Sequence, residues 1–160
     1  MTLDISKADS KYLNMAAEEA RKSGILYRHG CVAVSSGKVI ARGYNKYRSY
    51  SKDGLISENT TCHAEIDVLR KCKKQNMKSK LTMYVVRLSD SDNFSNSVPC
   101  AQCAEIMKSF DVKNICYSCA NGNIVKQQLK HFQSNFKTSG QVIYENYNDN
   151  PVTLYMKSNI

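Results

Sequence analysis

The segment Pro99-Cys100-Ala101-Gln102-Cys103, read together with Cys62-His63-Ala64-Glu65, decides how this sequence folds and what chemistry it supports. Both motifs stand where a helix is expected to begin. Two residues three positions apart on a helix share a face, so the Cys100 and Cys103 sulfurs can reach one ion at the tetrahedral spacing that zinc prefers. His63 can supply a nitrogen ligand from the other helix. The two motifs are therefore compatible with a zinc site formed where two helices start.

A zinc ion with three protein ligands keeps its fourth position for water, which is typical of catalytic rather than structural sites. Two thiolates and a neutral imidazole cancel the charge of Zn²⁺, so the metal alone acidifies that water less than an all-histidine site would. A general base is then needed nearby. Glu65 follows His63 by two positions, where it could take the water proton and pass protons on to the reacting atoms of a substrate.

The pairing of His-x-Glu with Pro-Cys-x-x-Cys is the signature of zinc-dependent nucleobase deaminases, and the sequence resembles the cytidine and deoxycytidylate deaminase superfamily. The similarity lies in residues 62–65 and 99–103, in Gly43-Tyr44-Asn45, and in the order of predicted elements from residue 7 to about residue 118. The resemblance implies an α/β fold of the cytidine deaminase-like type, with three layers (α/β/α) and a mixed sheet of about five strands.

The resemblance also implies roles for individual residues. His63, Cys100 and Cys103 would bind Zn²⁺, and Glu65 would be the catalytic acid and base. The expected substrate-binding residues are Asn45, Ala64, Lys46 and Arg48. The deoxycytidylate enzymes usually continue Gly-Tyr-Asn with a loop containing Gly and Pro, whereas this chain continues with Lys46-Tyr47-Arg48-Ser49-Tyr50. Phosphate recognition by this basic loop is therefore an expectation that no motif supports.

The expected reaction is hydrolytic deamination of a cytosine nucleoside or nucleotide to the uracil form, with release of ammonia. The alternative substrate is cytosine or adenine in single-stranded nucleic acid or tRNA, which the formal net charge of +9 favours. The absence of an extra binding domain argues against that alternative. The partner is therefore expected to be a small molecule, and relatives in the superfamily commonly assemble, so we expect a homo-oligomer.

A rival interpretation comes from a second Cys-x-x-Cys at Cys116 and Cys119. Together with Cys100 and Cys103, these residues could form a closed zinc ribbon, a non-catalytic module that binds nucleic acid. The helical pattern of residues 104–110 and the apolar strand around Cys116 suit short ribbon knuckles poorly. A ribbon would also leave the His-x-Glu motif without a function.

Composition limits the class of protein. A chain of 160 residues with 42% hydrophobic residues predicts one globular domain over residues 1–160. No apolar run reaches the about 18 residues of a membrane span, and no signal-peptide pattern opens the chain. Seven cysteines are an odd number, so we expect reduced thiols and a cytoplasmic or nuclear, non-secreted protein. The basic charge is also compatible with a solvated basic surface that has no partner.

Hydrophobic periodicity and turn residues predict an alternating order of helices and strands. Helices are expected at 7–23, at 62–75 with Thr60 or Thr61 as cap, and at 100–110 with Pro99 in the first turn; strands are expected at 31–34, 39–43, 81–88 and 112–118. Ser36 and Gly37 form the first turn. Residues 45–60 are expected to be a loop, and residues 89–97 to be irregular.

Two interpretations compete for residues 123–132. Asn121-Gly122 is a strong hairpin signal, which would make residues 123–129 an antiparallel strand. The alternative is a helix, because the apolar residues of this segment would share one helical face. The hairpin is preferred. Beyond it we expect a strand at 141–144 and a loosely ordered tail over about residues 146–160.

Overall fold

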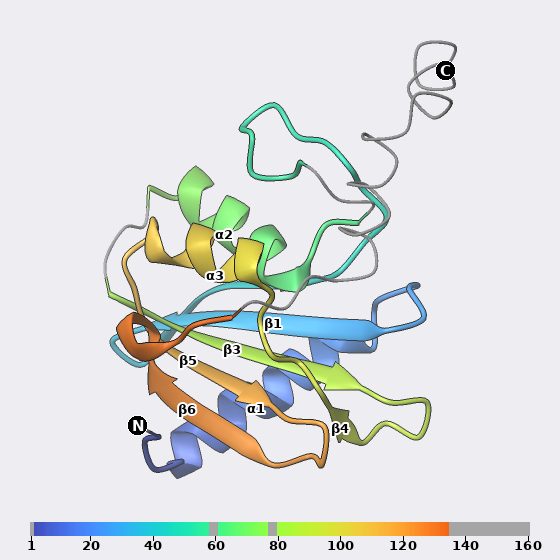
Figure 1. Ribbon diagram of the computed structural model, residues 1–160, viewed down its shortest axis with the longest axis vertical. Helices are drawn as coiled ribbons and strands as arrows, with labels where there is room; N and C mark the ends of the chain where they lie inside the picture. The colour runs from blue at the N-terminus through green and yellow to red at the C-terminus, as the bar shows by residue number, and fades with distance from the viewer. Residues whose placement is uncertain (1, 58–60, 77–79, 135–160) are drawn as a thin grey trace.

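The computed structural model describes residues 2–57, 61–76 and 80–134, and shows helices packed on a central sheet (Figure 1). The elements, in chain order, are α1 (Lys7–Ala20), β1 (Arg28–Ser35), β2 (Lys38–Tyr44), α2 (Ala64–Lys74), β3 (Leu81–Leu88), β4 (Phe94–Ser95), α3 (Ala101–Lys108), β5 (Val112–Ser118), β6 (Ile124–Gln128) and the 3₁₀-helix η1 (Leu129–His131). Within the described ranges, no helix is long and apolar enough to cross a membrane.

The sheet has the strand order β2-β1-β3-β5-β6, and β4 pairs with β3 outside this path. Strands β3 and β5 are parallel, and the other pairs are antiparallel. Helix α1 covers one face of the sheet, while α2 and α3 lie side by side on the other (Figure 1). The predicted α/β fold with three layers and a mixed sheet is therefore confirmed.

Strand β3 shows why the sheet is buried on both faces. Successive side chains of a strand point to opposite faces. Met83 and Val85 belong to the apolar cluster under α2 and α3, whereas Tyr84 and Val86 belong to the cluster under α1. A strand covered on both faces has an almost continuous apolar sequence, and this explains why the bounds predicted for β3 and β5 agree with the structure.

Helix α1 approaches the sheet closely at Gly30 of β1. A Cβ atom at this position would lie 1.9 Å from the Ala16 carbonyl oxygen, so any larger residue would push α1 away. The predicted turn between β1 and β2 is also present, with positive φ angles of 50° at Ser36 and 74° at Gly37. The close approach at Gly30 thus sets how near α1 lies to β1.

The sheet contains one strand more than the about five expected. The short strand β4 lies in the segment 89–97, which was expected to be irregular, and its residues pair with Arg87 and Leu88 of β3. Two residues are too few to produce a recognisable alternation of apolar and polar side chains. The expectation of an irregular segment is therefore wrong at these two positions.

The two site helices begin later than predicted. Helix α2 has His63 as its N-cap, so Thr61 is not the cap, and Thr60 lies outside the described residues. Helix α3 has Cys100 as its N-cap, so Pro99 precedes the helix instead of occupying its first turn. Both N-cap residues have extended backbones, with ψ of 154° and 166°. The site contacts described below require this backbone, which periodicity does not reveal.

The hairpin interpretation of residues 123–132 is confirmed, and the helical alternative is wrong. Strand β6 pairs antiparallel with β5, and Gly122 in the connecting loop has a φ of 84°. Five residues separate the two strands, and the Cys119 N–H donates to the Asn123 carbonyl at 2.8 Å to close the loop. The strand expected at 141–144 and the tail at 146–160 lie outside the described residues.

A buried carboxylate ties α1 to the sheet. Asp9 accepts hydrogen bonds from the Ser6 N–H at 2.9 Å, from the Tyr84 hydroxyl at 2.5 Å and from Lys126 Nζ at 3.0 Å. The first contact completes a capping box with Ser6. Burial alone would raise the pKa of Asp9, but these hydrogen bonds lower it to about 2. The ionised carboxylate therefore stabilises the contact of α1 with β3 and β6.

We expect protonation of Asp9 to lower the free energy of unfolding by about 2 kcal/mol as the pH drops from about 4 to about 2. The folded-state pKa of Asp9 lies below the ordinary value of 3.8, so its contribution is complete above that value and disappears on protonation. The Asp9→Asn variant should lose this share of the pH dependence and keep that of Asp53, whose pKa is also lowered to about 2. It should be about 2 to 4 kcal/mol less stable at neutral pH, because Lys126 loses its counter-ion. Urea unfolding at several pH values measures both effects.

The Asp90→Asn variant is the matched control, because Asp90 is exposed in the loop after β3. It should unfold like the wild type. An Asp9→Asn variant with wild-type stability at neutral pH would show that the network contributes nothing.

Candidate active site

The N-termini of α2 and α3 bring His63 and the two cysteines of α3 together. The Nδ1 atom of His63 lies 3.1 Å from the Cys103 Sγ atom and 3.6 Å from the Cys100 Sγ atom. The three potential ligand atoms all lie within 4.8 Å of one another. In the part of the chain that the structure describes, this is the group of His, Cys, Asp and Glu side chains that could hold a metal ion.

The backbone of Cys100 explains how one short helix presents two sulfurs to the same point. Cys100 is the N-cap of α3, and its Sγ atom accepts a hydrogen bond from the Cys103 N–H at 3.4 Å. This contact folds the Cys100 side chain back over the first turn. Both cysteines are buried, at 2% and 0% exposure, so their sulfurs face the interior next to His63.

The electrostatics of the pair favour a thiolate. The pKa of Cys100 is lowered to about 4, mainly by its hydrogen bond with the Cys103 thiol. His63 and the Cys103 N–H also lower this pKa, whereas burial raises it. Cys100 and burial raise the pKa of Cys103. The two sulfurs thus share one negative charge, and Cys100 ionises first. A cation between the sulfurs would offset the repulsion between two thiolates and allow both cysteines to ionise, because zinc binds cysteines as thiolates.

Glu65 lies beside this group, in the first turn of α2. Its side chain is 4% exposed, and its carboxyl group hydrogen-bonds with the Cys103 thiol. Burial raises the pKa of Glu65, and His63 opposes that shift. A buried carboxyl group next to three metal-binding side chains is placed to exchange protons with a molecule bound there.

The donor set fits zinc. Two sulfurs and one imidazole nitrogen are ligands that Zn²⁺ prefers, and their mutual distances allow a tetrahedral arrangement with one position left over. Closed structural sites use four protein ligands, whereas sites with three are typically catalytic. The three side chains could therefore hold a zinc ion.

The family model described as the cytidine and deoxycytidylate deaminase zinc-binding region matches residues 6–119. The chain belongs to this family. The match includes both site motifs and most of the sheet. The resemblance noted in the sequence is therefore confirmed, and so is the expectation of zinc as cofactor.

Solved structures of deaminases share the fold. The dCMP deaminase of cyanophage S-TIM5, in complex with dCMP and dUMP, has a TM-score of 0.55 and 17% identity, over 74% of this chain and 85% of the other. The cytidine deaminase of Burkholderia pseudomallei has a TM-score of 0.58 and 15% identity, over 75% of this chain and 91% of the other. A search of curated proteins finds no match to the sequence.

A pocket opens next to the zinc-binding group of this deaminase-family protein. Its lining residues are Leu55, Ile56, Ser57, Thr61, Cys62, His63, Ile66 and Gln102. The segment after β2 was expected to be a loop, and its residues 55–57 form one wall of the pocket. Arg70 of α2 contacts Asp53 at 2.9 Å, and Gln102 of α3 donates to the Ser57 carbonyl at 3.1 Å. Both site helices thus hold this wall in place.

Asn45, a predicted substrate-binding residue, bonds to the backbone of the segment that precedes and opens β1. Its Oδ1 atom accepts from the His29 N–H at 2.9 Å, and its Nδ2 atom donates to the Tyr27 carbonyl at 2.7 Å. The amide can make further hydrogen bonds, so contact with a substrate stays a prediction. The structure gives Asn45 an additional function, which is to fix the positions of Tyr27 and His29.

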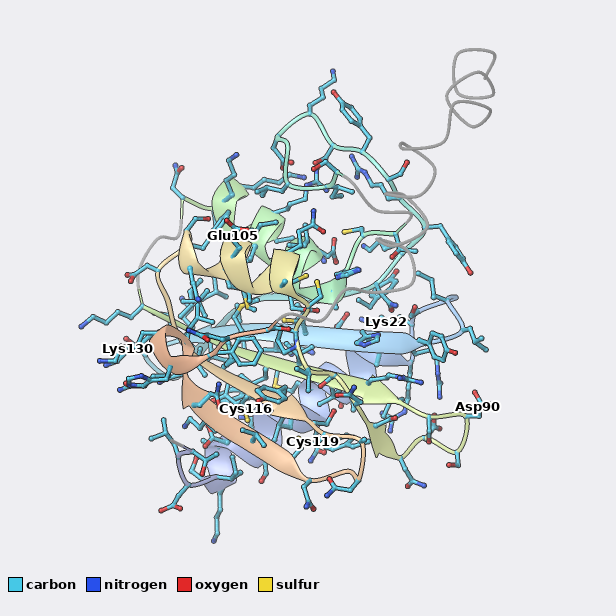
Figure 2. All side chains as sticks on the ribbon, in the orientation of Figure 1. Lys22, Asp90, Glu105, Cys116, Cys119 and Lys130 are labelled. Carbon is cyan, nitrogen blue, oxygen red and sulfur yellow. The ribbon has the colours of Figure 1, made fainter. Side chains whose placement is uncertain are left out.

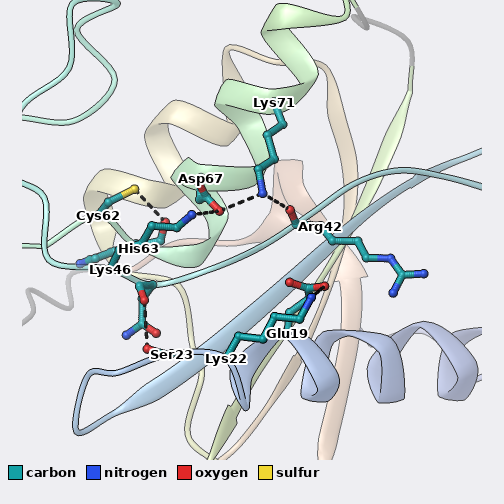
Figure 3. A network of polar contacts seen from close by, with 10 residues as sticks. Glu19, Lys22, Ser23, Arg42, Lys46, Cys62, His63, Asp67 and Lys71 are labelled. Carbon is teal, nitrogen blue, oxygen red and sulfur yellow. Dashed lines mark hydrogen bonds and ion pairs between the residues drawn. The ribbon is translucent and has the colours of Figure 1, made fainter.

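The other predicted substrate-binding residues differ in their surroundings. Ala64 is fully buried and begins α2 directly after His63. Lys46 lies 3.3 Å from Asp67, whose carboxylate also contacts Lys71 (Figure 3). Arg48 Nε donates to the Tyr50 carbonyl at 2.9 Å. Lys46 and Arg48 thus both have intramolecular partners. Their role in phosphate recognition stays a prediction.

The zinc-ribbon alternative is wrong. Cys116 belongs to the apolar cluster under α1, whereas Cys100 and Cys103 belong to the cluster under α2 and α3. The sheet therefore separates Cys116 from the other sulfurs. All described cysteines are free thiols.

Proposed function

We propose that this protein is a zinc-dependent hydrolytic deaminase that converts a cytosine nucleoside or nucleotide to the uracil form. The observation that supports this proposal most directly is the buried Glu65 carboxyl group beside His63, Cys100 and Cys103. This combination provides an acid and base next to a metal centre with one position left for water. The fold shared with solved deaminases is in agreement.

His63, Cys100 and Cys103 would hold the zinc ion, with His63 binding through the Nδ1 atom that faces both sulfurs. When bound, zinc supplies Lewis-acid activation of a water molecule. Glu65 would take one proton from the attacking water and pass it to the ring nitrogen beside the target carbon. It would then take the proton of the newly formed hydroxyl group and give it to the amino group, which leaves as ammonia while the carbonyl of the uracil form is made. The pocket wall of residues 55–57 lies on the same pocket as His63.

Deamination of a base in single-stranded nucleic acid or tRNA is the second candidate. Tyr47 and Tyr50 are 74% and 68% exposed, in the same basic loop as Arg48. Exposed aromatic rings among basic residues can stack on unpaired bases. The formal net charge of +9 favours a polyanionic partner as well.

Ammonia release from cytosine and adenine nucleosides, nucleotides and short oligonucleotides tests both candidates, with zinc content measured on the same protein. We expect turnover of a cytosine nucleoside or nucleotide that changes little with salt. Turnover of oligonucleotides alone, falling by about tenfold or more between 50 and 200 mM salt, would favour the second candidate, because binding to a polyanion releases counterions. Full zinc content without any ammonia release would contradict the proposed activity.

A further inference from the structure

Arg87 lies at the end of a central strand, on the face of the sheet that carries the candidate active site. It lies near the carboxyl end of β3, two residues after Val85, whose side chain packs under α2 and α3. Because side chains two positions apart on a strand share a face, Arg87 also points to the α2 and α3 side. Ligands of α/β proteins commonly bind outside the carboxyl ends of parallel strands. No motif in the sequence points to Arg87.

Among residues 2–57, 61–76 and 80–134, the guanidinium group of Arg87 forms no ion pair. Its Nε atom is buried and has no hydrogen-bond partner in the described part of the chain. Its charge is instead placed over the ring of Tyr27, 4.3 Å from the ring centroid. The neighbouring Arg28, by contrast, bonds to the Asp92 carboxylate at 2.7 Å. The Arg87 side chain is only partly buried, so its guanidinium group can be reached from outside. A buried N–H donor without a partner is costly, and Arg87 is therefore suited to receive an anion.

The surroundings connect Arg87 with the metal centre. His29 of β1 is the cross-strand partner of Arg87, and the charges of His63, Arg87 and Cys100 all affect its pKa. His29 therefore lies within electrostatic reach of both Arg87 and the zinc-binding group. Tyr27 is 52% exposed, and its carbonyl is held by His29 Nδ1 at 3.0 Å and by Asn45 Nδ2 at 2.7 Å. These contacts orient the ring on which Arg87 stacks.

We propose that Arg87, stacked on Tyr27, binds the phosphate of a cytosine nucleoside monophosphate, so that the substrate is the nucleotide instead of the nucleoside. This inference rests on the deaminase activity proposed above. A phosphate monoester carries up to two negative charges, and arginine binds it with two parallel N–H donors. In the loop predicted from the sequence, Lys46 already pairs with Asp67. Arg87 is therefore a better phosphate-binding site than this loop.

Replacement of Arg87 by glutamine tests the inference. We expect KM for dCMP to rise by about 10- to 100-fold, while KM for deoxycytidine stays within about twofold of the wild type. Arg87→Lys, which keeps the charge, should recover part of the dCMP affinity. Tyr27→Ala should raise KM for dCMP by about two- to fivefold through loss of the stacking contact. Wild-type melting temperatures for these variants establish that the changes are not due to unfolding.

Arg42→Gln is the matched control, because it removes the same charge from the other side of the sheet. Arg42 lies in β2 and pairs with Glu18 of α1 at 3.9 Å. We expect its kinetics with both substrates to equal those of the wild type. Equal loss of dCMP affinity in the Arg42→Gln and Arg87→Gln variants would mean that net charge alone is responsible, which overturns the inference.

Calorimetric binding of dUMP and deoxyuridine separates this inference from the proposed function, because neither compound has an amino group to lose. If no cytosine compound is deaminated, the proposed function is wrong, but dUMP affinity that depends on Arg87 supports the anion site. Equal or absent binding of dUMP and deoxyuridine overturns it. Faster turnover of an oligonucleotide than of dCMP, with the same dependence on Arg87, overturns the assignment to a mononucleotide.

Discussion

Replacement of Glu65 by glutamine is expected to lower kcat by about 10²- to 10⁴-fold while the protein keeps its full zinc content, because general acid and base catalysis contributes this much to a rate. Glutamine has nearly the size of glutamate and can still hydrogen-bond in the buried position that Glu65 occupies at 4% exposure. It cannot accept a proton from water or deliver one to ammonia. Steady-state kinetics with the best cytosine substrate, together with zinc analysis, measure both quantities.

Glu105→Gln provides the matched control for this prediction. Glu105 is exposed on α3 (Figure 2), so the same chemical change is made on a helix of the site without touching it. We expect its kcat and KM to equal those of the wild type. A fully active Glu65→Gln variant would refute the assigned proton transfers. Loss of zinc in that variant would mean instead that the carboxylate supports the metal centre itself.

The local sequence predicts those parts of the molecule that short-range rules determine. Strands β3 and β5 are recognisable because both of their faces are buried, which leaves an uninterrupted apolar run between polar flanks. The hairpin before β6 is recognisable because Gly122 has the positive φ that its turn requires. In each case the deciding interaction lies within a few residues along the chain.

The starts of the site helices could not be predicted in the same way. Because Thr60 or Thr61 was expected to cap the first helix and Pro99 to lie in the first turn of the second, the predicted helices extend backwards over His63 and Cys100. In the structure both residues have extended backbones, since their side chains must meet across two helices. That requirement comes from a contact between segments 37 residues apart. Tertiary interactions thus decide boundaries that helix propensity leaves open.

The candidate site shows the same division. The two motifs indicate His63, Cys100 and Cys103 without a structure, because residue type and spacing carry the chemistry of metal binding. Arg87 is different, because an arginine in a strand has no motif. Its position becomes evident only from the register that pairs it with His29 and from the ring of Tyr27 beneath it. Alternation along β3 is the one sequence signal that could have placed Arg87 on the active-site face.

Replacement of Cys100 by alanine is expected to remove stoichiometric zinc and, with it, all measurable deaminase activity. The Cys100 sulfur is both a proposed ligand and the N-cap of α3, so its loss weakens metal binding and the first turn together. Metal binding to the folded state stabilises it, by about 4 kcal/mol when the free metal is 1,000 times the dissociation constant. The variant should therefore melt at a lower temperature than the wild type. A chelator should lower the melting temperature of the wild type and leave that of the variant unchanged.

Cys116→Ala separates loss of a ligand from loss of a buried cysteine. Cys116 is as buried as the site cysteines, at 0% exposure, but packs on the α1 face of the sheet. We expect this variant to lose some stability through the cavity it creates and to keep one zinc per chain with normal turnover. Stoichiometric zinc in Cys100→Ala would mean that the ligand set is wrong. Loss of zinc from both variants would mean that metal content follows general stability. If Cys100 is a direct ligand, only the variant that removes it should lose zinc.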